Sequence, residues 1–276
     1  MIVMTYKIGF LAERADSNAE NIIHTANRGE TVPKKSVVQV WFPETGTSLA
    51  YYNDKFDLRC GDLVYVEGKL EGVLGRVTEV SCNFKIRLSD YKRVTALVDT
   101  DVKGRFYMAG SHFVTFERGT LPASKVVNWF KAPENGDDDF VSGTDDTSFF
   151  LSDPCSMKVS DSIAERGHDY YMENKVKYIC LDGSKGYAVV EGSKSYEVEF
   201  EYNDGRISNL VCTCFCSYNC KHEFAAMLQL RETLEFIENH YDEEFRRTGY
   251  LAAVVKSALF AFAIDNSRQG SFTIDL

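Results

Sequence analysis

The feature that most restricts how this chain can fold is a dense group of cysteines between residues 212 and 222. Four of the eight cysteines lie between Cys212 and Cys220, and His222 follows two positions later. Thiolate and imidazole groups at this density are the ligands of a tetrahedral zinc ion, which ties together the segments that carry them. The alternative interpretation is a redox pair or a set of buried thiols. We predict one bound Zn²⁺.

The spacing within this group favours one set of four ligands. The pair Cys212 and Cys214, at the end of a predicted strand, can point both thiolates toward one ion, and the pair Cys220 and His222, at the start of a predicted helix, supplies the other two ligands. Cys216 is a fifth candidate that could replace Cys212. We favour Cys212 because the predicted strand leads directly into it. Four protein ligands leave no open position, so we expect a structural site.

Composition and charge set broader limits. The 276 residues have the hydrophobic and charged content of an ordinary globular protein, and their net charge of −10 argues against a general binder of polyanions. Six acidic residues and no basic one lie within residues 134–146. The N-terminus shows no secretory signal, and the longest apolar run, residues 250–264, is shorter than the roughly 20 residues of a membrane span. We expect an intracellular, cytoplasmic protein with no membrane association.

The first half of the chain is predicted to form mainly short strands. Residues 1–35 start with an apolar run over 4–11, which predicts a strand, and continue as a loose polar arm. Residues 36–131 are predicted to form a small β-barrel of the SH3 or OB size class, because β-branched runs alternate with turn residues and glycines interrupt one strand. We expect its strands near residues 37–42, 48–52, 63–66, 71–80, 84–88, 94–98, 105–108 and 112–116, then a short helix over 121–130.

Part of this region resembles a known DNA-binding module. The phrases Leu-Ala-Tyr-Tyr, Cys-Gly-Asp-Leu-Val-Tyr-Val-Glu-Gly and Gly-Val-Leu-Gly-Arg-Val, within residues 36–80, resemble the N-terminal DNA-binding barrel of the primosomal replication-restart helicase. The chain departs from that family at Glu67-Gly68, where the family has Pro-Phe-Gly, and no helicase motif follows. The resemblance implies DNA binding. A generic barrel used for protein contacts or for packing is the alternative.

The second half begins after an acidic linker predicted over residues 132–154. A short helix is expected from Ser160 to Gly167, followed by a meander of strands that delivers the chain into the cysteines. Asn203-Asp204-Gly205 is a strong hairpin signal within this meander. After His222 we expect one helix with an apolar face. The segment 241–276 is predicted to be helical and to include a buried helix over residues 250–264, because that run is apolar around most of its circumference.

The zinc segment also resembles a known family, the SWIM zinc finger. The resemblance covers residues 163–238 and implies a structural zinc in a domain that binds DNA or protein, spanning residues 155–240. Its ligands would be Cys212, Cys214, Cys220 and His222, and the gap between the second and third cysteines is shorter than is typical of the family. The matching positions upstream are Arg166-Gly167-x-x-Tyr170-Tyr171, Val176 and Gly192-Ser193-x-x-Tyr196-x-Val198.

These observations predict an α+β protein with a structural role for its metal. We find no Ser-His-Asp arrangement and no phosphate-binding Gly-rich loop, so we expect that the protein is not an enzyme. The hypothesis is nucleic-acid binding, most directly to DNA, and the alternative is a protein-interaction adaptor. A homo-oligomer could form through the apolar C-terminal helix. The residues predicted to contact nucleic acid or a partner are Lys221, Tyr218, Lys194, Arg206 and Arg76.

Overall fold

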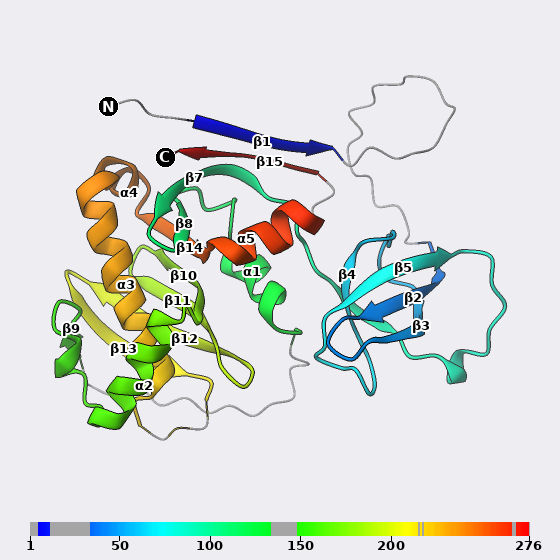
Figure 1. Cartoon of the computed structure of the whole chain (residues 1–276), viewed down its shortest axis with the longest axis horizontal. Coiled ribbons are helices and arrows are strands. Elements are labelled where there is room, and N and C mark those ends of the chain that lie inside the picture. Colours follow the sequence, from blue (N-terminus) through cyan, green and yellow to red (C-terminus); the bar gives the residue numbers. More distant parts are fainter. Residues whose placement is uncertain are drawn as a thin grey trace. The chain divides into compact units, whose positions relative to one another are not determined.

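The computed structural model describes residues 5–11, 34–133, 148–214, 216, 218–266 and 269–275. The chain divides into two compact units (Figure 1). Unit 1 comprises residues 1–10, 100–130 and 135–276, and unit 2 comprises residues 11–99 and 131–134. The loose arm and most of the acidic linker predicted from the sequence lie outside the described residues. Each unit contains one β-sheet, and unit 1 also contains the α-helices that the structure describes. This combination confirms the α+β class.

The sheet of unit 1 has ten strands in the order β1-β15-β7-β8-β14-β10-β11-β12-β13-β9. β15 runs parallel to β7, whereas the pairs from β7 to β9 are antiparallel. The strands are β1 (Thr5–Leu11), β7 (Lys103–Ala109), β8 (His112–Thr115), β9 (Phe149–Phe150), β10 (Val176–Asp182), β11 (Lys185–Glu191), β12 (Ser195–Asn203), β13 (Arg206–Cys212), β14 (Tyr250–Val255) and β15 (Gln269–Asp275).

The meander β10 to β13 forms as its sequence predicts. Most of β10 and β11 is buried on both faces, β12 is more exposed, and tight turns join the strands. In the β12–β13 turn, Asp204 and Gly205 have φ angles of 47° and 82°, the left-handed region that this kind of hairpin requires. The turn sets the register near it, and a bulge between Glu199 and Glu201 shifts that register by one residue, so that Val198 of β12 lies opposite Cys212 at the end of β13. The meander thus delivers the first metal-ligand candidate to a defined place.

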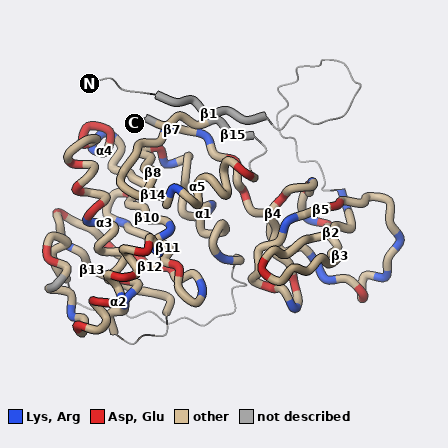
Figure 2. Tube along the Cα trace, viewed as in Figure 1, with Lys and Arg blue, Asp and Glu red and all other residues tan. Residues whose placement is uncertain are grey.

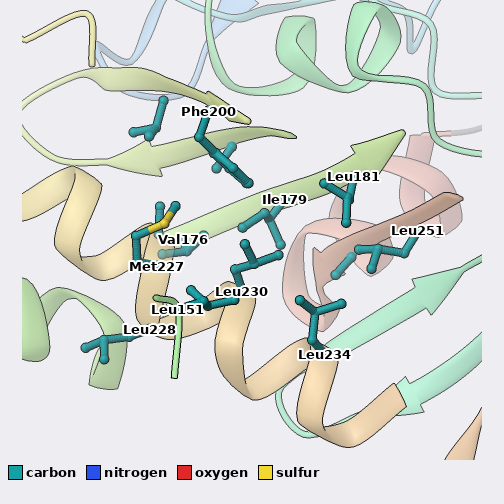
Figure 3. Packing of buried hydrophobic residues seen from close by; sticks show 14 of the residues in the cluster. Leu151, Val176, Ile179, Leu181, Phe200, Met227, Leu228, Leu230, Leu234 and Leu251 are labelled. Atoms are coloured by element: carbon teal, nitrogen blue, oxygen red, sulfur yellow. The ribbon is translucent and has the colours of Figure 1, made fainter. Parts of the chain in front are cut away.

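Helices cover both faces of this sheet. On one face lie α2 (Asp161–Met172) and α3 (Lys221–His240), and in Figure 3 Leu230 and Leu234 of α3 project toward Ile179 and Leu251. Gly167 lets the two helices approach closely, because a Cβ there would lie 2.9 Å from the Cβ of Phe224. The predicted helix therefore does not end at Gly167 but continues through it. The shorter elements η2 (Pro154–Ser156) and α4 (Asp242–Thr248) flank this layer.

The other face of the sheet carries α1 (Ala123–Phe130), α5 (Lys256–Leu259) and the π-helical turn η3 (Phe260–Ile264). The hydroxyls of Tyr178 and Tyr250 both donate to the carbonyl oxygen of Leu121, just before α1, at 2.6 and 3.1 Å. Trp129 stacks on Phe262 with ring centroids 5.1 Å apart. The predicted helix over residues 121–130 is thereby confirmed.

Unit 2 has a five-stranded sheet in the order β3-β2-β5-β4-β6. A Cβ at Gly75 would lie 2.4 Å from Val40, so the glycine in β5 is required by packing. An isolated parallel bridge joins Tyr52 to Arg93, beside the edge strands β3 and β6, but no continuous ladder closes the described strands into a barrel. The elements are β2 (Ser36–Phe42), β3 (Thr47–Asn53), β4 (Leu63–Val66), β5 (Gly75–Ser81), the 3₁₀ turn η1 (Leu88–Asp90) and β6 (Val94–Leu97).

Three predictions about the first half and the C-terminus are wrong. Residues 84–88 form a loop rather than a strand, and β7, β8 and α1 belong to unit 1 rather than to a domain that ends at residue 131. The predicted helix over residues 250–264 begins only at Lys256, because Tyr250–Val255 is strand β14, paired with β8 and β10, and the chain ends in strand β15 rather than in a helix. An apolar run buried on both faces suits a central strand as well as a helix. These six residues are all buried, so they offer no surface to a second copy.

Candidate metal centre

The four predicted ligands converge where β13 ends and α3 begins. Cys212 is the last residue of β13, and Cys220 is the N-cap of α3. The side-chain ligand atoms of Cys212, Cys214, Cys220 and His222 all lie within 4.8 Å of one another. This cluster is therefore close enough to hold one metal ion. The fifth candidate, Cys216, is exposed and does not belong to the cluster.

The strand ladder explains why Cys212 and Cys214 face the same side. Thr213 continues the β12–β13 pairing, since its backbone N donates to the carbonyl of Glu197 and its Oγ1 accepts from the backbone N of Glu197, both at 3.0 Å. Residues two apart along an extended chain point to the same face. The spacer Thr213 is thus held outward by its own hydrogen bonds, which leaves the two thiols on one side.

The start of α3 holds the other two ligands. The backbone N of Cys220 donates to Oε2 of Glu223 at 2.7 Å, and the backbone N of Glu223 donates to Sγ of Cys220 at 3.5 Å. This reciprocal pair is a capping box in which a cysteine takes the place usually held by Ser or Thr. One residue therefore caps the helix and presents a ligand sulfur, and an N–H group points at that sulfur.

His222 faces the thiols through one ring nitrogen. Its Nδ1 lies 3.8 Å from Sγ of Cys212 and 3.7 Å from Sγ of Cys220. The ring stacks on Tyr196, with centroids 4.2 Å apart and planes 19° apart. Gly192 lies against the far side of the imidazole, because a Cβ at this position would come within 3.3 Å of Nε2 and 2.9 Å of the Tyr196 ring. The orientation of His222 is thus fixed by Tyr196 and Gly192.

The electrostatics of the cluster fit a cation. Burial raises the pKa of Cys214 to about 12, and the Cys212 thiol together with burial raises the pKa of Cys220 far above its usual range. Burial, followed by the positive charge of Lys221, lowers the pKa of His222 to about 4. Crowded thiols hold their protons when no cation is present, whereas a bound dication stabilises the thiolates. A neutral imidazole is the form that ligates metal.

The four predicted contact residues that lie in unit 1 have different surroundings. Tyr218 is 86% exposed in the loop between the second and third ligands, and Lys194 is exposed on the β11–β12 turn, with its Nζ 5.7 Å from the Tyr196 ring centroid. Lys221 instead donates to the Tyr170 hydroxyl at 2.7 Å and supports the site. Arg206 starts β13, six residues and about 20 Å from the ligand at its other end.

The fifth predicted contact residue, Arg76, belongs to β5 of unit 2, where its Nη1 donates to the carbonyl of Gly61 at 3.4 Å.

Two residues that shape the site, Glu223 and Gly192, were not predicted from the sequence. The Cys-x-x-Glu spacing was a signal for the first, because it matches a capping box. His112 is buried, and its two ring nitrogens form hydrogen bonds with the Ser111 hydroxyl and the Val176 carbonyl.

Comparison with known proteins identifies one related segment. Over 83 residues, or 30% of this chain, the sequence is 31% identical to an uncharacterized protein of Methanocaldococcus jannaschii. The match covers 35% of that protein, so the chain spans about a third of the length of this relative. No protein-family model and no solved structure matches the chain. In the part of the chain that the structure describes, no helix is both long enough and apolar enough to cross a membrane.

Proposed function

We propose that this chain is a non-catalytic zinc protein of the SWIM type that binds nucleic acid. The observation that carries the zinc assignment is the set of four ligand atoms within 4.8 Å at the junction of β13 and α3. Three cysteines and one histidine are a frequent ligand set of structural zinc, and soft thiolates disfavour calcium and magnesium. The ion would join the end of the meander to the helix that covers its core.

The donor set also argues against catalysis at this site. Four protein ligands fill a tetrahedral ion, which leaves no position for a water nucleophile or a substrate. Cys220 and His222 are buried, and Tyr196 and Gly192 close the side of the imidazole away from the thiols. Zinc would therefore stabilise unit 1, and the function would depend on exposed residues. The clustered thiols suit a reducing compartment, so we propose a cytoplasmic location.

Nucleic-acid binding is supported by residues near the metal and by unit 2. Tyr218 offers an aromatic ring on which a base could stack, and Lys194 is also exposed. For unit 2 we propose a small SH3-like or OB-like barrel, with the Tyr52–Arg93 bridge as its closing contact. Barrels of this size commonly bind single-stranded nucleic acid. DNA is the form we propose to test first.

A protein-interaction adaptor is the second candidate, favoured by apolar exposure beside the metal loop. Val211 is 39% exposed at the end of β13, and Tyr218 is more exposed still. Among the described residues, β9 pairs with Arg206 and Ile207 and no strand pairs with the outer edge of the rest of β13, where a partner's strand could be added. The net charge of −10 also disfavours nonspecific contact with polyanions.

Fluorescence anisotropy of labelled single-stranded and duplex DNA distinguishes the two candidates. Zinc-loaded protein should bind DNA at about 50 mM salt and lose affinity steeply toward about 200 mM, because phosphate contacts release counterions. A Tyr218→Ala variant should bind more weakly, whereas Met172→Ala, which removes another exposed apolar side chain of unit 1, serves as the control. No binding of either DNA by zinc-loaded protein at low salt would refute the nucleic-acid function and favour the adaptor.

A further inference from the structure

One end of the unit 2 sheet carries a group of lysines and arginines that the metal site does not explain. We call this group the basic end; its members come from four separate segments. They are Lys34 and Lys35 before β2, Lys55 after β3, Lys85 and Arg87 after β5, and Lys92 and Arg93 before β6. In Figure 2 the long loop that follows β5 carries mostly blue charged positions.

Strand register brings these segments together. Ser36, at the start of β2, lies opposite Asn53, at the end of β3, and the neighbouring Val37 lies opposite Ser81, at the end of β5. The Tyr52–Arg93 bridge adds the segment before β6, because the backbone N of Tyr52 donates to the carbonyl of Lys92 at 2.9 Å. Residues just beyond these strand ends therefore share one edge of the unit.

Most of these cations have no acidic partner among the residues that the structure describes. Arg93 pairs with Asp54 and lies over the Tyr52 ring, 5.3 Å from its centroid. The other six side chains are exposed, and among the described residues of the chain none of the six forms an ion pair. The acids nearby are engaged elsewhere: Asp57 pairs with Arg59, and Asp90 accepts from the Ser89 hydroxyl. The basic end thus has positive charge available for an anionic ligand.

Apolar side chains alternate with the cations in the loop. Phe84, Ile86 and Leu88 alternate with Lys85 and Arg87, and Leu88 is 54% exposed. In an extended chain, residues two apart lie about 6.6 Å from each other, which is comparable to the separation of successive phosphates in an extended nucleic-acid strand. Alternating cations and apolar groups suit a ligand that offers phosphates and unpaired bases together.

The loop is held in place rather than projecting freely. The Phe84 ring packs edge-on against Tyr52, with centroids 6.1 Å apart. At its other end, the backbone N of Arg93 donates to Oε2 of Glu67 at 3.2 Å, and the carbonyl of Arg93 accepts from the backbone N of Glu67 at 2.9 Å. Ordering costs are lower for a segment that is already fixed.

We propose that the basic end of unit 2 is a binding surface for single-stranded nucleic acid. The inference rests on the proposed nucleic-acid function and assigns it a face and a strand form. A duplex stacks its bases internally, so it could use the lysines but not the apolar residues between them. The half-buried Tyr91 adjoins Lys92 and offers one further ring for stacking.

The test uses the zinc-loaded full chain and a labelled 20-nucleotide oligothymidylate. If all six exposed cations contact phosphates, log K should fall with log salt at a slope of roughly −4, which is a loss of about 300-fold between 50 and 200 mM salt. Replacing Lys85, Arg87 and Lys92 with alanine should reduce that slope to roughly −2 and weaken binding about tenfold or more at 50 mM. A matched control replaces Lys103, Lys158 and Lys185, three exposed lysines of unit 1, with the same change in net charge.

Three results separate the possible failures. The inference is supported if the basic-end variant keeps its zinc and fold but loses affinity while the control binds like the parent. It is overturned if the variant binds with the same affinity and the same salt dependence as the parent. It is also overturned if a duplex of equal length binds as tightly as the single strand. Failure of the parent to bind any nucleic acid would instead refute the proposed function itself.

Discussion

Replacing Glu223 with alanine removes the capping box that joins the metal centre to α3. The carboxylate accepts from the backbone N of Cys220 at 2.7 Å, and both residues are buried. Without it, a buried N–H group loses its partner, which costs about 1 to 3 kcal/mol, a range that includes the usual cost of losing an N-cap. For a unit of this size we expect Tm to fall by about 4 to 8 °C, taking 2 kcal/mol as the central value.

The same substitution should weaken metal binding. Glu223 positions the backbone around the Cys220 sulfur, and loss of such supporting groups typically lowers metal affinity about 10- to 100-fold. Calorimetry gives Tm, and competition with a chromophoric chelator gives the zinc affinity. Glu223→Gln keeps an acceptor oxygen and should recover most of both losses, whereas Glu235→Ala, on the exposed side of α3, should change neither. Parental Tm and zinc affinity in Glu223→Ala would refute the role assigned to the box.

Two further predictions concern the scaffold. Gly167→Ala should lower the free energy of unfolding by about 1 to 3 kcal/mol, because the new Cβ would meet Phe224 and the Lys221 carbonyl at 2.9 to 3.0 Å. Denaturant titration measures this loss, and a variant as stable as the parent would contradict the close packing of α2 on α3. Burial lowers the pKa of His112 to about 4, so the unfolded state binds the extra proton and stability falls as pH drops below about 6.5. The contribution of His112 to this loss should reach about 2 kcal/mol at pH 5, so His112→Gln should lose about 2 kcal/mol less than the parent between pH 7 and pH 5, and an equal pH dependence in both proteins would contradict this.

The convergence of the four candidate ligands was predictable because the residues that determine it are close in the sequence. Four ligands within eleven residues, with a strand before them and a helix after them, define the site without knowledge of distant contacts. The hairpin at Asp204-Gly205 was predictable for the same reason, since its backbone angles depend on the turn residues themselves. What the local pattern did not show was the ring of Tyr196 on His222, which depends on the β11–β12 turn reaching the helix start.

The prediction of a helix from residue 250 was wrong because the apolar pattern of this segment fits a strand as well as a helix. Tyr250–Val255 is apolar at every position, and only pairing with β8 and β10 makes it a strand. These partners lie well over 60 residues away in the sequence, so local periodicity could not reveal them. Gly249, with a φ of 59°, ends α4 directly before the strand and was the local sign of a break.

The domain boundary was misplaced for a related reason. β7 and β8 look like further barrel strands, with the same short alternating pattern as those of unit 2. Their partners are β15 and β14, so they complete the sheet of unit 1. Strand propensity predicts that a segment is extended but not which neighbour it will pair with. The acidic composition after residue 132 marked a linker, yet the chain had already entered unit 1 at residue 100.

The zinc content of the purified chain and of three cysteine variants tests the central claim most directly. Plasma mass spectrometry should find one zinc per chain, and the zinc should be lost in Cys212→Ser and Cys220→Ser, with loss of cooperative unfolding of unit 1. Cys216→Ser should keep the full amount, because this thiol lies outside the cluster. A full zinc complement in Cys220→Ser, or its loss in Cys216→Ser, would contradict the proposed metal centre.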